Sequence, residues 1–435
     1  MLTDPVIVIP GITATYLEDR YNLPHETIWA VITKDYERAA LHPDDLRYEA
    51  REPALVRSGQ LYEIAYEELI EELRYNLSER ETLPVPVYPY GYDWRHPLER
   101  IATDLEPFIE EVITRTALLR HYDKDGYGDR RKVNLVGHSM GGLVIQMYLA
   151  RKKAESRVNR VVSLATPFRG SFESIPKLTT GTANLGSDPQ KSRERDAARM
   201  TPALYYLLPD LVDDIEVADG LTRDLFAPEA WQPSILQTIE QYVRDHGLKS
   251  GGRKEQARDI FTALLDAARK GRLETLAKVR LEDAGLTGDD WLCVAGADAE
   301  TRVRLSIVKR GRAPEFEFRS IHLQNRWESD IVEERWQTGD GTVPLRGAVP
   351  QFLPPEKVVC VRPGDFGYWE IGDKAALQLG GFHGILPNMN MVHRLIVRFL
   401  KDLKDTHGNT WGAPLPGVAK DAWSPPLNGG LRHRA

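Results

Sequence analysis

Short apolar runs of strand length recur along this sequence and alternate with longer stretches of helical spacing. The strand-like runs occupy residues 5–12, 85–90, 133–136, 160–167, 291–296 and 357–361. Stretches with helical spacing occupy residues 61–77, 98–120, 141–149 and 390–403. Strands that alternate with helices form a parallel sheet with helices on its faces. The pattern therefore predicts an α/β fold with a mostly parallel central sheet flanked by helices.

The alternation stops between residues 172 and 288, where two helical patterns, 233–245 and 254–284, follow one another without an intervening strand. We therefore predict an inserted, mainly helical cap or lid at 172–288. The core is then divided into an N-terminal part, 1–171, and a C-terminal part, 289–404. Residues 301–308 and 315–323 alternate as in a β-hairpin. The tail, 405–435, is rich in Gly, Pro and Asn and either wraps the surface or is partly disordered.

One segment carries a recognisable catalytic motif. Gly-His-Ser-Met-Gly at 137–141 follows a buried strand and opens a helix. This is the context of the nucleophile elbow of α/β-hydrolases, in which a sharp turn presents the serine hydroxyl. Ser139 is therefore the candidate nucleophile, and the N–H of Met140 is a candidate oxyanion donor. In this fold the loop after an earlier strand supplies the second N–H, and we assign that role to Ile12, just past Gly11.

The candidate general base is a histidine near the end of the chain. In this fold the residues follow the order Ser, then Asp or Glu, then His. His383 follows the last strand and precedes the terminal helix, where the base belongs. It is favoured over His393, which lies within that helix and is expected to pack or face outward. His138 is expected to point away from the Ser139 side.

Two aspartates compete for the role of the acid that orients the base. Asp340 lies in a tight Gly-Asp-Gly turn, which holds a carboxylate rigidly and lets backbone approach closely. Asp298 follows a strand, as many hydrolase acids do. We favour Asp340 and keep Asp298 as the alternative, although either residue also fits an ordinary solvated turn.

Candidate substrate contacts come from an apolar, aromatic run at 203–208 in the cap, between two prolines. Leu204, Tyr205 and Leu208 either line an acyl-chain pocket or pack the cap, which is the commoner fate of such a run. Asp93 and Arg95 are expected to pair and brace the loop beside the serine.

These segments together resemble the lecithin:cholesterol acyltransferase family, which includes bacterial lipase-like and phospholipase-like relatives. The matching pieces lie in family order at residues 6–11, 92–95, 137–141, 339–343 and 383–385. The resemblance implies an α/β-hydrolase with a cap that acts on acyl esters of lipids. It maps the nucleophile to Ser139, the acid to Asp340 and the base to His383, and it implies oxyanion donors at Ile12 and Met140. Nothing in the sequence identifies a sterol acceptor.

Composition and charge limit the kinds of binding partner and the cellular location that we expect. The 435 residues have a formal net charge of −7 and no long basic run, which makes nucleic acid an unfavoured partner. No apolar run approaches the length of a membrane span, so membrane contact is expected to be peripheral at most. The N-terminus lacks the pattern of a signal peptide, which predicts a cytoplasmic location. Cys293 and Cys360 are expected to be buried thiols, and two cysteines give no metal-site spacing.

The sequence thus predicts a serine carboxylester hydrolase of lipase or phospholipase type that needs neither cofactor nor metal. Two alternatives stay open: an O-acyltransferase that uses the same acyl-enzyme with an alcohol acceptor, and a non-catalytic binding module on a hydrolase fold. The presence of Ser, Asp and His in the required order argues against the second. The pattern leaves the oligomeric state open.

Overall fold

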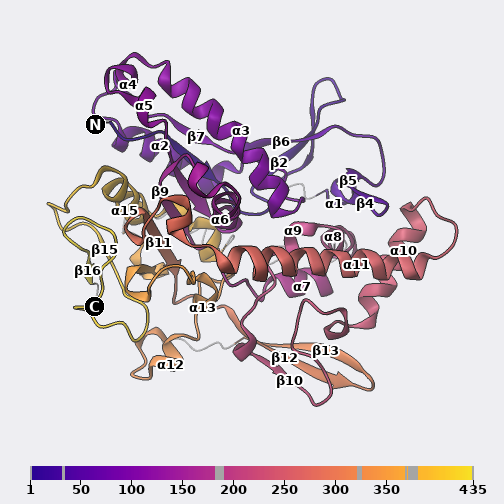
Figure 1. Cartoon of the computed structure of the whole chain (residues 1–435). Helices are drawn as coiled ribbons and strands as arrows, with labels where there is room; N and C mark the ends of the chain where they lie inside the picture. Colours follow the sequence, from indigo (N-terminus) through magenta and orange to yellow (C-terminus); the bar gives the residue numbers. More distant parts are fainter. Residues whose placement is uncertain are drawn as a thin grey trace.

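A six-stranded parallel sheet forms the centre of the molecule (Figure 1). The computed structural model describes residues 2–31, 35–181, 191–320, 326–367, 370 and 381–433. All neighbouring strands of this sheet run parallel. In spatial order they are β7 (Val87–Pro89), β1 (Val6–Ile9), β8 (Val133–His138), β9 (Val158–Leu164), β11 (Trp291–Gly296) and β14 (Val358–Val361). The predicted α/β fold is confirmed.

Side chains from the sheet alternate between two apolar cores. Ile7 and Ile9 belong to a core shared with α3 (Leu98–Ala117) and α6 (Met140–Lys152). Val6 and Val8 belong to a second core shared with α2 (Glu63–Leu77) and α15 (Asn390–Lys401). Because helices cover both faces, the central strands are apolar at nearly every position, as is usual for a parallel sheet.

The N-terminal segment between β1 and α2 is itself folded into strands. β2 (Thr15–Asp19), β3 (Glu26–Trp29) and β6 (Val56–Leu61) form an antiparallel sheet, and β4 (Leu41–His42) pairs with β5 (Asp45–Glu49). The short helix α1 (Tyr36–Ala39) lies in the same segment, and further short helices elsewhere in the chain are α4 (Arg120–Lys124), α5 (Tyr127–Arg130), α12 (Val332–Arg335) and α13 (Leu345–Ala348). The sequence pattern predicted none of these strands between residues 13 and 60.

The expected pair of Asp93 and Arg95 fastens this N-terminal segment to the core. Arg95 donates to Asp93 at 2.7 Å, to Glu49 of β5 at 2.9 Å and to the carbonyl of Ala39 at 3.0 Å. The guanidinium is fully buried, and burial without these carboxylates would be costly. Burial alone would raise the pKa of Asp93, but the Arg95 guanidinium beside it holds that pKa well below its usual range.

Helices and a small sheet lie beside the central sheet, and most of them belong to the segment predicted as the cap, 172–288 (Figure 1). The helices are α7 (Ser174–Thr179), α8 (Lys191–Arg199), α9 (Pro202–Tyr205), α10 (Pro233–His246) and α11 (Arg253–Arg269). The predicted hairpin is formed by β12 (Arg302–Arg310) and β13 (Ala313–Ser320), and its predicted residues 321–323 lie outside the described ones. It pairs with β10 (Ile215–Val217), which lies in the segment predicted as the cap, whereas the hairpin lies in the segment predicted as core. Alternation predicts a hairpin but not the sheet it joins.

The described part of the tail wraps the sheet edge. Ala413 exchanges two hydrogen bonds with Cys360 of β14, at 2.8 and 3.0 Å, and β15 (Trp411–Gly412) pairs with β16 (Arg432–His433). Arg398 of α15 donates to the carbonyls of Asn428 and Gly430. Of the two alternatives for the tail, residues 405–433 therefore adopt the surface wrap.

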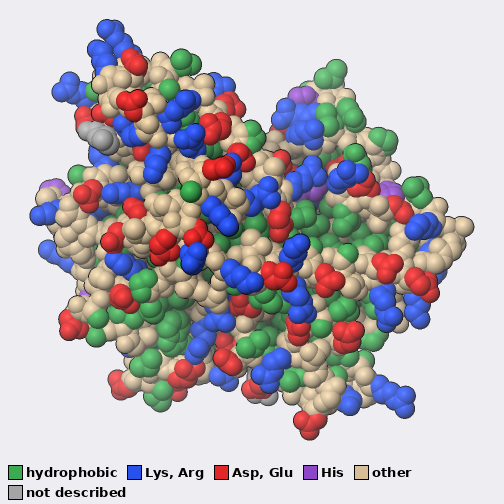
Figure 2. Space-filling view, viewed as in Figure 1, with side chains coloured by type: hydrophobic (Ala, Val, Ile, Leu, Met, Phe, Trp, Pro, Cys, Tyr) green, Lys and Arg blue, Asp and Glu red, His purple; other side chains and the backbone are tan. Residues whose placement is uncertain are grey.

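Acidic and basic side chains are interspersed over the face shown in Figure 2, with apolar side chains between them. This mixture fits the modest net charge of −7 and gives no extended basic surface on this face. Within the described ranges, none of the helices combines the length and the apolar character needed to cross a bilayer.

His393 packs inside α15 and does not face the serine. Its Nε2–H donates to the carbonyl of Pro387 at 2.7 Å, and burial lowers its pKa to about 4. A histidine whose pKa is lowered in the folded state gives stability that is complete above pH 6.5 and is lost as the pH falls toward 4.

We therefore expect His393→Gln to flatten the pH dependence of unfolding. Glutamine keeps a donor for Pro387 but does not titrate, so wild type should lose roughly 3 kcal/mol more than the variant between pH 7.5 and pH 4. Urea unfolding of both proteins at several pH values measures this difference. Parallel pH profiles would contradict the assignment of His393 as a buried neutral group.

Candidate active site

Ser139 lies at a sharp turn between β8 and α6. Its backbone has φ 53° and ψ −126°, a conformation that a residue with a side chain rarely adopts and that is typical of a nucleophile elbow. The turn packs directly on β1. A Cβ on Gly141 would lie 2.2 Å from the carbonyl oxygen of Ile9, and a Cβ on Gly137 would lie 2.8 Å from the Gly141 carbonyl carbon. Both glycines are therefore required by close backbone approach.

The serine, histidine and aspartate singled out from the sequence are joined by hydrogen bonds. His383 Nε2 lies 2.9 Å from Ser139 Oγ, and His383 Nδ1 lies 2.7 Å from Asp340 Oδ2. His383 sits in a helical turn at 381–385, more than 240 residues beyond the serine in sequence. The side chain of Asp340 is 1% exposed and that of His383 13% exposed, so the pair is screened from water but the imidazole is reachable.

Backbone donors fix the carboxylate of Asp340. Its Oδ1 accepts the N–H groups of Thr342 at 2.9 Å and Val343 at 2.7 Å, which leaves Oδ2 for His383. Gly296, at the end of β11, makes room for this loop, because a Cβ there would lie 2.4 Å from the Asp340 Cβ. Asp298 is exposed two residues further along the chain. The structure thus brings Asp340, and not Asp298, to His383.

The segments that carry the two candidate oxyanion donors lie beside the serine. A Cβ built on Gly11 would be 3.0 Å from the Ser139 Cβ, so the loop after β1 lies against the nucleophile. Ile12 lines the same cavity as Ser139. The N–H of Met140 belongs to the first turn of α6 and has no partner within the helix. The positive end of the helix dipole adds to the attraction of this N–H for negative charge at the serine.

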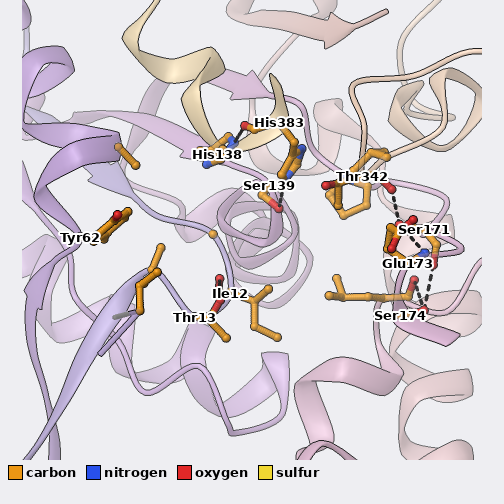
Figure 3. A pocket seen from close by; sticks show the side chains of 18 of the residues that line it. Ile12, Thr13, Tyr62, His138, Ser139, Ser171, Glu173, Ser174, Thr342 and His383 are labelled. Atoms are coloured by element: carbon orange, nitrogen blue, oxygen red, sulfur yellow. Dashed lines mark hydrogen bonds between the residues drawn. The ribbon is translucent and has the colours of Figure 1, made fainter. Parts of the chain in front are cut away.

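A cavity of about 620 Å³ opens at the serine. Figure 3 shows Ser139 between Tyr62 on one side and Ser171, Glu173 and Ser174 on the other. Apolar side chains predominate in the lining. They come from the loop after β1, the segment after β3, the start of α2, the loop after β9, helix α9 and the turn that follows it, and the loops that carry Asp340 and His383; they are Ile12, Ala14, Val31, Ile64, Ala65, Pro167, Leu204, Leu207, Val343 and Ile385. The cavity therefore offers apolar surface on both sides of the serine hydroxyl.

The cap residues proposed as substrate contacts divide between two environments. Leu204 lines the cavity, together with Leu207, which the sequence analysis did not name. Tyr205 and Leu208 are not among the lining residues. Both are fully buried, and the Tyr205 hydroxyl donates to the carbonyl of Arg199 at 2.8 Å. The short helix α9 therefore directs Leu204 toward the cavity and Tyr205 into the cap.

Wall residues from the N-terminal half were missed because their segments carry no motif. Ile64 and Ala65 belong to the start of α2, Tyr62 is the residue just before it, and Val31 follows β3. In the folded structure Ile64 is apolar yet 57% exposed, which fits the rim of a binding cavity.

The chemistry that the described side chains offer here is that of a hydroxyl, an imidazole and a carboxylate. Among the described residues, no three His, Cys, Asp or Glu side chains are arranged to hold a metal ion.

Part of this chain is similar to a known protein family. The family model for lecithin:cholesterol acyltransferase (LCAT) matches residues 58–241, which include Ser139. Residues 58–241 are LCAT-like. Among the curated relatives that match this chain is lecithin-cholesterol acyltransferase-like 4 of Arabidopsis thaliana, 24% identical over 203 residues. Another is phospholipase A(1) LCAT3 of the same plant, 30% identical over 89 residues.

These LCAT-like matches are partial. The first alignment covers 39% of this chain and 35% of the relative, and the second covers 20% and 17%. The chain thus spans about a third or less of the length of these curated relatives. A solved structure described as the Tle4–Tli4 complex covers 79% of this chain and 88% of that chain, with 18% identity and a TM-score of 0.54, which shows a shared fold.

The close packing of the elbow on β1 gives a prediction about stability. We expect Gly141→Ala to destabilise the protein by about 3 kcal/mol, because the new methyl group would have to displace the backbone of β1. Gly128→Ala is the matched control, since a Cβ there meets nothing within 4 Å. Thermal and urea unfolding measure both variants. Equal stability of the two would contradict the packing described for the elbow.

Proposed function

We propose that the protein is a serine carboxylester hydrolase that acts on acyl esters of lipids through an acyl-enzyme on Ser139. The observation that carries the proposal is the unbroken line of hydrogen bonds from Ser139 through His383 to Asp340, opening into a largely apolar cavity. A hydroxyl becomes a competent nucleophile when an adjacent base accepts its proton and a third group orients that base.

In the first step, Ser139 Oγ attacks the ester carbonyl while its proton passes to His383 Nε2. The N–H on Nδ1 donates to Asp340, which holds the imidazole in the required tautomer and stabilises the imidazolium without taking the proton. Negative charge develops on the carbonyl oxygen of the tetrahedral intermediate. The N–H groups of Ile12 and Met140 are proposed to stabilise it, and each such donor contributes roughly 3–4 kcal/mol.

The intermediate collapses when the bond to the alcohol oxygen breaks and His383 gives its proton to the leaving alcohol. The acyl group then remains as an ester on Ser139. A water molecule attacks this ester, its proton passes to His383, and the carboxylic acid leaves as the proton returns to Ser139 Oγ. Every proton that the reaction moves is therefore handled by a single imidazole.

The lining of the cavity supports a substrate with an apolar acyl chain. Burial of each methylene in such a lining contributes about 0.8 kcal/mol, so a long chain gains more than an acetyl group. The word phospholipase in the name of one relative and the family name LCAT point to the same substrate class. On these grounds we propose lipids as the esters.

Acyl transfer is the second candidate, because the family whose model matches residues 58–241 is named for an acyltransferase. An alcohol that replaces water in the second step would give a new ester through the same intermediate. Product analysis with added alcohols separates the two: free acid as the dominant product supports hydrolysis, and a dominant new ester supports transfer.

The proposed roles predict a graded loss of reactivity. We expect wild type to be labelled by a fluorophosphonate probe and Ser139→Ala not to be labelled. His383→Ala and Asp340→Asn should each lower kcat for an ester by about 10³- to 10⁴-fold, because the base is lost or its tautomer is wrong.

Asp298→Asn is the matched control for Asp340→Asn, since it removes the alternative acid. It should leave kcat within about threefold, the scale of a surface substitution away from the reacting groups. Equal labelling of wild type and Ser139→Ala would refute the enzyme proposal, and a larger loss in Asp298→Asn would reassign the acid.

The cap leucines give a test of the substrate. Leu204→Ala should lower kcat/KM for a decanoyl ester about tenfold more than for an acetyl ester, because it removes apolar surface from the cavity. Leu208→Ala removes a second buried leucine, one that does not line the cavity, and should leave the ratio of kcat/KM values for the two esters unchanged. A strong preference of wild type for acetyl esters would exclude a lipase.

A further inference from the structure

Two tyrosine hydroxyls hold a single peptide unit next to the nucleophile. The Gly11 N–H donates to the hydroxyl of Tyr66 at 2.9 Å, and the Pro10 carbonyl accepts from the hydroxyl of Tyr92 at 2.8 Å. These two groups belong to the same peptide plane, between Pro10 and Gly11. With a partner at each end, this plane cannot rotate without breaking a buried hydrogen bond. The following peptide carries the N–H of Ile12, and its own carbonyl, that of Gly11, accepts from the Ala14 N–H at 3.4 Å.

Tyr66 also contacts the residue before the nucleophile. Its hydroxyl lies 2.6 Å from His138 Nδ1, and His138 Nε2 lies 3.0 Å from the carbonyl oxygen of His383. The rings of His138 and His383 lie 4.9 Å apart. Figure 3 shows His138 next to His383 above the serine. One chain of contacts thus leads from the loop after β1 to the backbone of the candidate base.

The direction of each hydrogen bond follows from the chemistry of the groups. The carbonyl oxygen of His383 can only accept, so His138 Nε2 carries a proton. Nδ1 then has a lone pair and accepts from the Tyr66 hydroxyl, whose oxygen in turn accepts from the Gly11 N–H. Every group in the chain is satisfied in this one arrangement, with His138 neutral.

The environment maintains that neutral form. His138 and Tyr66 are both buried, and burial, with the charge of nearby His383, holds the pKa of His138 well below its ordinary value. Burial likewise raises the pKa of the Tyr66 hydroxyl. A neutral His138 matters for catalysis, because a cation so close to His383 would oppose the imidazolium that forms there.

We propose that Tyr66 and His138 are positioning residues that couple the oxyanion loop after β1 to the backbone of the general base. Neither side chain takes part in the reaction steps described above. The proposal rests on the proposed function, since it concerns the same site. Its physical content is that the loop carrying Ile12 and the turn carrying His383, which are far apart in sequence, move as one unit.

The first test compares three deletions of a buried tyrosine hydroxyl. Tyr66→Phe leaves both the Gly11 N–H and His138 Nδ1 without partners and should lower kcat about 10- to 100-fold, with KM changed less than about threefold. Tyr92→Phe frees only the Pro10 carbonyl and should have a clearly smaller effect on kcat. Tyr122→Phe removes a hydroxyl that donates to Thr3, remote from the site, and should leave kcat unchanged.

A double-mutant cycle tests the coupling itself. His138→Gln keeps an amide N–H that can reach the His383 carbonyl but loses the acceptor for Tyr66. If the two residues act through one chain, the losses in kcat of Tyr66→Phe and His138→Gln will not multiply in the double variant. Losses that multiply, or a Tyr66→Phe enzyme no slower than Tyr122→Phe, would overturn the proposal.

A spectroscopic measurement decides the tautomer without any catalytic assay. In ¹⁵N NMR of the full chain, His138 should be a neutral Nε2–H imidazole at pH 6, and Tyr66→Phe should shift its Nδ1 signal or its titration. A protonated or Nδ1–H imidazole in wild type would overturn the proposal. A protein with the expected tautomer that fails to react with esters or fluorophosphonate would instead refute the proposed function.

Discussion

The whole site depends on one strained residue held between the sheet and a helix. Ser139 adopts positive φ at the end of β8, and that conformation costs free energy of the order of 1–3 kcal/mol. It persists because β1 passes directly under the turn, close enough that a methyl group on Gly141 would collide with the Ile9 carbonyl. The parallel sheet therefore does more than enclose a core. It supplies the rigid surface against which the nucleophile is presented.

The same sheet brings together residues that the chain separates. Asp340 follows β11 by a long excursion, and His383 follows β14, yet both reach Ser139 because the carboxyl ends of parallel strands lie at one edge. The N–H groups of Thr342 and Val343 and the absence of a side chain at Gly296 then fix the carboxylate. Architecture brings the groups close, and local hydrogen bonds set their angles.

The features of the fold and site that could be predicted from the sequence are those that depend on residues close together along the chain. The elbow around Ser139, strand β1 and the tight turn at Asp340 have short-range signatures, and the sequence analysis found all three. The pairing of the β12–β13 hairpin with β10 could not be predicted, because the alternation of apolar and polar residues within a strand does not indicate which distant strand it pairs with. Whether Leu204 or Tyr205 faces the cavity depends on how a four-residue helix is rotated, which no periodicity reports.

His138 illustrates the same limit at the level of one side chain. From the sequence, the side chain of His138 was expected to point away from the Ser139 side, and no partner for it could be named. In the structure its partners are Tyr66 of α2 and the carbonyl of His383, which lie 72 and 245 residues away in sequence. Only the folded arrangement reveals that its two ring nitrogens have different partners. Hydrogen bonds of this kind depend on how distant helices and strands pack together, and the residue pattern within one helix or strand does not predict that packing.

The tail that wraps β14 has a consequence for how molecules of this protein meet. An open parallel sheet ends in two strands whose unpaired backbone groups invite pairing with another chain. At one edge, β7 is short and ends at Pro89, which has no N–H to offer. At the other edge, Ala413 pairs with Cys360 and the Trp423 indole donates to the carbonyl of Val358 at 2.9 Å. Each edge of the sheet is thus protected against intermolecular strand addition, one by proline and the other by the chain's own tail.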